Sequence, residues 1–182
     1  ALTEEKRAWA QDTTAQTLSD VMADADVFLG VSGPGTLTQS DVQQMASQPI
    51  VFALANPEPE LRPELIREVA LDAIIATGRS DYPNQINNAL CFPYLFRAAL
   101  DSATTMINQA MKRACVLALA DMARSDAHFG KEYIVPTLLD KRLLTGVTPK
   151  IAMAAHNSGV ARKYLNEGEY YAQLQELATT LI

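Results

Sequence analysis

The chain has 182 residues, of which 48% are apolar and 20% are charged, and its formal net charge is −6. This length and apolar content are enough for a single globular domain with a sizeable core. The acidic charge, without runs of lysine or arginine, argues against binding to nucleic acid or to an anionic membrane surface, and no apolar run approaches the roughly 20 residues of a membrane span.

The compartment is indicated by the first residues and by the cysteines. Residues 1–10 are rich in charged side chains and do not have the pattern of a secretory signal peptide. Cys91 and Cys115 lie far apart in apolar sequence, which excludes a disulfide framework or a CxxC metal site and favours two reduced core thiols. We therefore expect a cytoplasmic protein.

Polar helices and short apolar runs alternate along the first half of the chain. Residues 2–25 are polar with spaced apolar side chains, which predicts helical segments. Beyond them we predict strands at 27–31, 50–54 and 73–77 and helices at 38–47 and 63–71. Apolar strands without alternation, separated by helices, indicate a parallel sheet that is covered on both faces.

The second half of the chain is predicted to be helical. A helix over 84–101 should bend at Pro93, and a longer helix follows over 104–124. Residues 125–146 are rich in loop formers.

Two capping patterns follow that loop. Thr148-Pro149 predicts an N-cap and a first helical residue for a helix over 150–162. Asn166 and Glu169 form a capping pattern for a last helix that ends at Ile182.

The chain has no G-x-G-x-x-G turn, the sequence that normally opens a dinucleotide-binding domain. Its three strands are therefore interpreted as the later, distal strands of a doubly wound sheet. The predicted fold class is α/β with three layers, a Rossmann-like parallel sheet and C-terminal helices, in one domain over residues 1–182.

Unusual residues follow the predicted strands, and ligands of open parallel sheets bind beyond the carboxyl ends of the strands. The loop Gly30–Gly35 is glycine-rich, so its backbone could approach a flat ligand closely. Asn56-Pro57 offers an amide that can both donate and accept a hydrogen bond. Taken alone, the first loop could equally be a plain tight turn and the second an Asx-turn. We expect both to converge with the third loop on one rim of the sheet.

The third loop carries four amides, Asn84, Gln85, Asn87 and Asn88, at the start of the predicted 84–101 helix. The free N–H groups and the dipole of a helix N-terminus favour anions. Amides could bind a carboxylate there without adding a charge that needs a partner. One N-cap needs a single amide, so this pattern favours binding over capping alone.

Other polar residues are weaker candidates. His128 and His156 have no cysteine or carboxylate at metal-ligand spacing, and Asp81 and Asp101 have no second carboxylate nearby, so structural or surface roles are expected for all four. Arg79 could pair with a phosphate or carboxylate of a ligand, or with an acidic neighbour.

Three segments at the predicted rim carry a family resemblance. They are Asp26–Gly35 (DVFLGVSGPG), Ile50–Pro57 (IVFALANP), and Ala76–Asn88 (ATGRSDYPNQINN) followed by Cys91-Phe92-Pro93. In order and spacing they resemble the nucleotide-binding domain of malic enzymes, the oxidative decarboxylases of malate. Weaker similarity continues to Val160.

The resemblance implies conversion of L-malate to pyruvate and CO2 with NAD or NADP and a divalent metal, Mg2+ or Mn2+. It implies that Asn56, Asn87 and Asn88 contact the substrate. The cofactor contacts that it implies are Val31, Ser32, Gly33, Gly35 and Asn56. Malic enzymes are commonly dimers or larger, so the resemblance also implies a homo-oligomer.

The chain departs from the family pattern at the chemical centre. The family's catalytic tyrosine and lysine, its acidic metal ligands and its dinucleotide fingerprint have no counterpart here. We therefore expect a part of a longer polypeptide that carries no catalytic or metal-ligating residue and is inactive alone. Two alternatives stay open: a related enzyme such as an amino-acid dehydrogenase, which would need an ammonia-handling Lys/Asp set, and a binding or assembly module without catalysis. Residues upstream of Ala1 would separate them.

Overall fold

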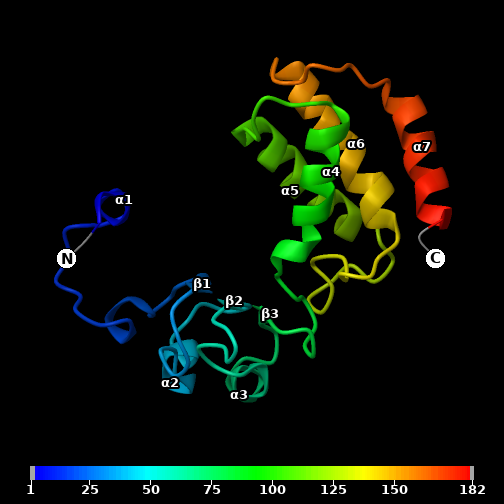
Figure 1. Ribbon diagram of the computed structural model, residues 1–182. Coiled ribbons are helices and arrows are strands. Elements are labelled where there is room, and N and C mark those ends of the chain that lie inside the picture. The colour runs from blue at the N-terminus through cyan, green and yellow to red at the C-terminus, as the bar shows by residue number, and fades with distance from the viewer. Residues whose placement is uncertain (1–2, 181–182) are drawn as a thin grey trace.

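The computed structural model describes residues 3–180, which form two lobes (Figure 1). The first lobe contains the sheet and its covering helices, and the second contains four helices, α4 to α7. Each lobe has a hydrophobic core of its own.

The sheet has three parallel strands in the order β1 (Val27–Gly30), β2 (Ile50–Ala53) and β3 (Ile74–Thr77). The strands start in register, since β1 pairs with β2 from their first residues and β2 with β3 likewise. The predicted α/β class and parallel sheet are confirmed. Because the strands also end in register, the three loops that follow them leave from one rim.

Helices α2 (Gln39–Gln43) and α3 (Pro63–Val69) lie on the same side of the sheet (Figure 1). The core beneath them includes Phe28, Val51 and Ile75 from the three strands. Each helix begins at a defined residue: Thr38 and Asp41 form a capping box at α2, and Pro63 occupies the first turn of α3, where its missing N–H is tolerated.

The opposite face of the sheet is exposed at β1 and partly covered at β2 and β3 within residues 3–180. Val27 and Leu29 of β1 point to this face and are 55% and 63% exposed. The expectation that both faces are covered therefore holds for one face of the described chain.

The segment before β1 differs from the prediction of helical segments over 2–25. It contains only a four-residue helix, α1 (Glu4–Arg7), and a 3-10 turn, η1 (Ser19–Val21), among the described residues. Met22 is the one buried residue between positions 3 and 25, and Trp9 is 87% exposed. Short helices that bury no apolar face are marginal in water, which explains why the polar pattern did not produce longer ones.

Helix α6 (Arg142–Asn157) is the centre of the helical lobe and packs against α4 (Phe92–Asp101), α5 (Gln109–Arg124) and α7 (Glu167–Thr180). Its buried residues Leu143, Val147 and Ile151 recur at helical spacing and form much of the second core. None of the helices described is both long enough and apolar enough to cross a lipid bilayer.

The start of α6 differs from the prediction. Thr148 and Pro149 lie inside the helix, which begins at Arg142, eight residues before the predicted range of 150–162. A proline inside a helix costs about 3 kcal/mol. The apolar stripe of α6 buries enough surface against its three neighbours to outweigh that cost, at about 1.5–3 kcal/mol for each large side chain.

The predicted 84–101 and 104–124 helices, in contrast, start later than expected. Helix α4 begins at Phe92, so Pro93 lies in its first turn and produces no bend in its middle. Helix α5 begins after Asn108, whose side chain accepts a hydrogen bond from the backbone N–H of Met111. The predicted cap of the last helix is confirmed, because Asn166 accepts from the N–H of Glu169 at 3.2 Å. The predicted end at Ile182 lies outside the described residues.

The loop 125–141 connects α5 to α6 and also contacts the sheet lobe. The Asn84 side chain is its main anchor on the sheet side: Nδ2 donates to the carbonyls of Ile75 (2.9 Å) and Lys131 (2.7 Å), and Oδ1 accepts from the N–H of Ile134 (2.8 Å). An ion pair between Arg67 of α3 and Glu132 of the loop, at 2.7 Å, adds a second tie.

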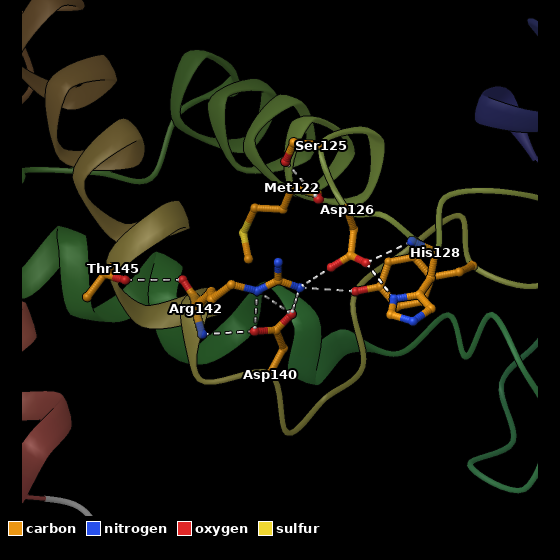
Figure 2. Close-up of polar contacts among 8 residues, drawn as sticks. Met122, Ser125, Asp126, His128, Asp140, Arg142 and Thr145 are labelled. Atoms are coloured by element: carbon orange, nitrogen blue, oxygen red, sulfur yellow. Dashed lines mark hydrogen bonds and ion pairs between the residues drawn. The ribbon is translucent and has the colours of Figure 1, made fainter.

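The same loop is anchored to the helical lobe by Arg142, the first residue of α6 (Figure 2). Its guanidinium Nη2 lies 2.6 Å from Asp126 and 2.7 Å from Asp140. The loop therefore has both ends fixed by side chains, and its contacts with Asn84 connect the second lobe to the end of the sheet.

Candidate functional site

A buried carboxylate connects the first two loops of the sheet rim. Glu60 is 1% exposed, and its Oε1 accepts hydrogen bonds from the backbone N–H (2.8 Å) and the hydroxyl (3.2 Å) of Ser32. Its Oε2 accepts from the N–H of Ala55 at 3.1 Å, and its backbone carbonyl accepts from the N–H of Gly35 at 2.9 Å. One residue thus holds the glycine-rich loop after β1 beside the Asn-Pro loop after β2.

The position of Glu60 explains the glycine at the end of β1. A Cβ atom on Gly30 would lie 2.5 Å from Cδ of Glu60 and 2.7 Å from the ring of Phe28. Any larger residue would displace the carboxylate from beneath the loop.

Glu60 remains ionised in this buried position. Burial acts to raise the pKa of its carboxyl group, but the hydrogen bonds from Ser32 and Ala55 outweigh burial, so the pKa is below its ordinary value. A buried carboxylate needs such donors, because an unpaired one would be strongly penalised.

The glycine-rich loop itself is open. Val31 is 79% exposed, and Gly35 has a φ of +76°, a conformation that favours glycine. Among the described residues, no heavy atom comes within 4 Å of where a Cβ of Gly33 or Gly35 would stand. The loop therefore has room for a flat ligand.

Asn56 connects the second and third loops. It is exposed, and its Nδ2 donates to the carbonyl of Leu54 at 3.2 Å. A Cβ atom on Gly78, just after β3, would lie only 2.5 Å from this Nδ2. Glycine at position 78 is thus what allows the Asn56 side chain to lie against the end of β3.

The third loop turns back along the end of β3. Gln85 pairs with Thr77 in an isolated parallel bridge, the N–H of Ile86 donates to the carbonyl of Thr77 at 2.8 Å, and Nε2 of Gln85 donates to the carbonyl of Gly78 at 3.2 Å. Asn88 is three residues beyond Gln85, which places it within about 10 Å of that residue.

The four amides of the third loop have separate roles, so the prediction that they gather at the start of one long helix is wrong. Asn84 is 6% exposed and joins the lobes, with a positive φ of 55° that suits asparagine. Gln85 bonds to the end of the sheet. Asn87 caps the short 3-10 helix η2 (Asn88–Leu90) by accepting from the N–H of Ala89 at 2.9 Å. Residues 84–87 are not helical, and the chain forms only the 3-10 helix η2 before α4 begins.

Asn88 is the amide of this loop that is left exposed. Its backbone carbonyl accepts a weak hydrogen bond from the thiol of Cys91, at 3.3 Å, and no hydrogen bond of its side chain is found within residues 3–180. No hydrogen bond joins Asn87 or Asn88 to Asn56 in that part of the chain. Substrate binding by these three residues, and cofactor binding by the Val31–Gly35 turn and Asn56, stay predictions.

Sequence reasoning missed Glu60, Gly78 and the anchoring role of Asn84. Glu60 lies in a charged, proline-rich segment, a composition typical of an exposed loop, and its partner Ser32 is 28 residues away in sequence. The signal that could have identified Asn84 is its place directly after Pro83, where an asparagine often adopts the left-handed conformation of a turn.

Arg79 pairs with acidic neighbours, which was one of its two possible roles. Its guanidinium lies 2.7 Å from Glu58 and 2.7 Å from Asp81, and 5.6 Å from the ring centre of Tyr82. These contacts raise the pKa of Arg79 and lower that of Asp81. The cluster is partly exposed, so it contributes mainly to the shape of the third loop.

The other polar candidates lie away from the rim. His128 is exposed and contacts Asp126 at 2.9 Å (Figure 2), and His156 packs against the ring of Tyr164. Asp101 pairs with Arg97 and accepts from the hydroxyl of Tyr170.

The described residues do not by themselves fit a divalent metal. Between residues 3 and 180, no three or more His, Cys, Asp or Glu side chains converge as a metal centre would require. A pocket of about 520 Å³ does exist in the helical lobe, between α4, α7 and the 138–141 segment. Its lining residues all lie outside the three rim loops, so it is separate from the candidate site.

Comparison with known proteins gives a consistent result. Residues 1–160 match the family model described as "Malic enzyme, NAD binding domain". The NADP-dependent malic enzyme of Escherichia coli is 48% identical over 93% of this chain and 24% of its own length, and that of Halomonas elongata is 50% identical over 89% and 42%. The crystal structure of Entamoeba histolytica malic enzyme superposes with a TM-score of 0.84 at 32% identity, over 90% of this chain and 34% of that one.

The chain thus spans about a quarter of the Escherichia coli protein and less than half of the Halomonas protein. Residues 1–160, which include the parallel sheet, thus correspond to the NAD-binding domain of these enzymes. By its sequence and by its fold, the chain belongs to the malic enzyme family, within the NAD-binding domain.

Proposed function

We propose that the sheet rim supplies the nicotinamide- and malate-contacting loops of an enzyme that converts L-malate to pyruvate and CO2 with NAD or NADP. The observation that supports this most is the junction of the three loops: Glu60 bonds to the first and the second, and Asn56 packs on Gly78 of the third. The names of the relatives, NADP-dependent malic enzymes, support the choice of reaction.

The residues of the rim suit a dicarboxylic hydroxy acid beside a flat ring. The open glycine turn leaves space for the ring. The exposed amides of Asn56 and Asn88 can donate to a carboxylate and accept from a hydroxyl without bringing a charge of their own. When bound, the nicotinamide accepts the hydride that leaves C2 of malate.

Proton transfer and metal chemistry are assigned in this proposal to residues of the full enzyme outside this chain. The described residues include no converging metal ligands, and the contacts of Glu60 and Asn56 that join the rim loops involve no His, Lys or Tyr side chain. We therefore propose that residues 1–182 alone have no malic enzyme activity. A malate-dependent formation of NADH or NADPH by the purified chain would contradict this.

The test of the site uses Asn56→Ala and Asn88→Ala in the full-length enzyme. A lost hydrogen bond to a charged substrate should raise the malate KM about 10-fold or more, or lower kcat to match. Asn157→Ala is the matched control, because Asn157 is an exposed asparagine at the end of α6, in the other lobe. If both rim variants had the same malate KM and kcat as the control, the assignment would fail.

We also propose that the full enzyme is a cytoplasmic homo-oligomer. Cys91 and Cys115 are free thiols, as expected in a reducing compartment, and oligomers are common in the family that the chain resembles. Light scattering on the full-length protein would test the assembly, and a monomeric mass would contradict it.

A further inference from the structure

The Glu60 carboxylate accepts three hydrogen bonds, all of them from residues of the rim loops. Both carboxylate oxygens are used, one for each of two loops that lie more than twenty residues apart in sequence: Oε1 for Ser32 and Oε2 for Ala55. The N–H of Leu54 donates to the carbonyl of Gly30 at the ends of the strands, and the buried carboxylate holds the two loops together beyond that point.

The same contacts determine the hydrogen-bonding polarity of Ser32. Its backbone N–H and its hydroxyl both donate to Oε1 of Glu60. The hydroxyl has one hydrogen and two lone pairs, so a Ser32 hydroxyl whose hydrogen is directed at Glu60 can only accept from a ligand. A ligand at this loop must therefore present a donor, as a ribose hydroxyl or a carboxamide NH2 does.

The second oxygen of Glu60 acts on Asn56 through the backbone. The N–H of Ala55 donates to Oε2, and Asn56 is the next residue. Movement of the carboxylate would shift the start of the Asn-Pro loop relative to the glycine-rich loop. Gly30 contributes to the same arrangement, because only glycine leaves room for the Glu60 side chain at that point.

From this geometry we infer that Glu60 is a positioning residue: it fixes Asn56 relative to the glycine-rich loop and orients the Ser32 hydroxyl as an acceptor for the nicotinamide half of the cofactor. The inference rests on the proposed function, since it concerns the same rim. It adds the residue that holds the rim together and the kind of group, a hydrogen-bond donor, that the cofactor presents to Ser32.

The main test is Glu60→Gln in the full-length enzyme. Glutamine has the size of glutamate, but its amide nitrogen cannot accept from the N–H of Ser32 or Ala55, so one of the two loops is released. We expect the KM for NAD(P) to rise about 10-fold or more, as for an unsatisfied buried donor. Inhibition by ADP, a probe of the adenine half of the cofactor, should stay as in the wild type.

Glu68→Gln is the matched control, because Glu68 is an exposed glutamate on α3 whose partner, Gln39, can still donate to a glutamine. It should leave the KM for NAD(P) unchanged. A loss of folded enzyme would reduce kcat with an unchanged KM, so the rise in KM together with unchanged ADP inhibition separates positioning from general damage.

Ser32→Ala provides a second measurement if Glu60→Gln folds poorly. It keeps the backbone hydrogen bond to Glu60 and removes only the hydroxyl acceptor, so the KM for NAD(P) should rise a few-fold, about 3- to 10-fold. An unchanged KM in Ser32→Ala would overturn the acceptor role. An unchanged KM in Glu60→Gln would overturn the positioning role. If the wild type showed malate-dependent activity in the same assay, the proposed function would still stand. A wild type without that activity would overturn both.

Discussion

Replacing Asn84 by alanine should weaken the connection between the two lobes. The side chain makes three hydrogen bonds, to the carbonyls of Ile75 and Lys131 and from the N–H of Ile134. At about 1 kcal/mol of net stability each, their loss amounts to about 3 kcal/mol. Alanine at a φ of 55° adds about 1 kcal/mol of backbone strain, because it lacks the local hydrogen bonds by which asparagine tolerates this conformation. We expect a loss of about 4 kcal/mol in total.

The measurement is urea unfolding of the wild type and of Asn84→Ala, with amide hydrogen exchange at Ile134 as a local readout. Asn157→Ala, an exposed control in α6, should change the free energy of unfolding by less than about 0.5 kcal/mol. The reasoning would be refuted by a loss below about 1 kcal/mol in Asn84→Ala, or by Ile134 exchange as slow as in the wild type.

Three further predictions follow from single contacts. Gly78→Ala in the full-length enzyme places a Cβ 2.5 Å from Nδ2 of Asn56, so kcat/KM for malate should fall about 10- to 100-fold. Steady-state kinetics would check this, and a wild-type kcat/KM would contradict it. The hydroxyl of Thr148 is buried without a hydrogen-bond partner among the described residues, so Thr148→Val should raise the free energy of unfolding in urea by about 1 kcal/mol; a destabilised variant would count against it. Hydrogen bonds from His128 and Arg142 hold the pKa of Asp126 well below 3.8. The stabilising contribution of the ionised carboxylate is therefore complete above pH 3.8 and is lost as the pH falls further. The urea midpoints of the wild type and of Arg142→Met should converge below pH 3.8, and a constant difference between them would refute this.

The strands were predictable from sequence because buried parallel strands are continuous apolar runs. The structure places β1, β2 and β3 inside the predicted ranges, shorter by one residue at one end, as for Ile50–Ala53. The convergence of the loops followed from the parallel arrangement, since strands that end in register release their loops on one rim.

The helix boundaries were less predictable because tertiary packing decided them. Thr148-Pro149 has the local chemistry of a helix start, yet α6 begins six residues before Thr148, at Arg142, and its buried apolar stripe begins at Leu143. The segment 84–91 has helix-compatible residues, but hydrogen bonds of Asn84 and Gln85 to the sheet and to the loop 125–141 hold it in an irregular path.

The contacts that assemble the rim were beyond sequence reasoning for a different reason. Glu60 acts through partners that are distant along the chain, and nothing in a charged, proline-rich segment indicates that one of its carboxylates is buried. Asn56 could be identified as a candidate because a polar residue directly after a buried strand is a local pattern. The need for glycine at Gly78 depends on where the Asn56 side chain lies, which only the folded chain shows.

The open side of β1 has a practical consequence for handling the chain. Within the described residues β1 pairs only with β2, so the backbone groups of its outer edge are available, and Val27 and Leu29 add an apolar surface beside them. Such an edge is a template for strands of other molecules. Concentrated samples of these residues on their own should therefore precipitate through sheet extension, and lysine in place of Leu29 should keep them dispersed.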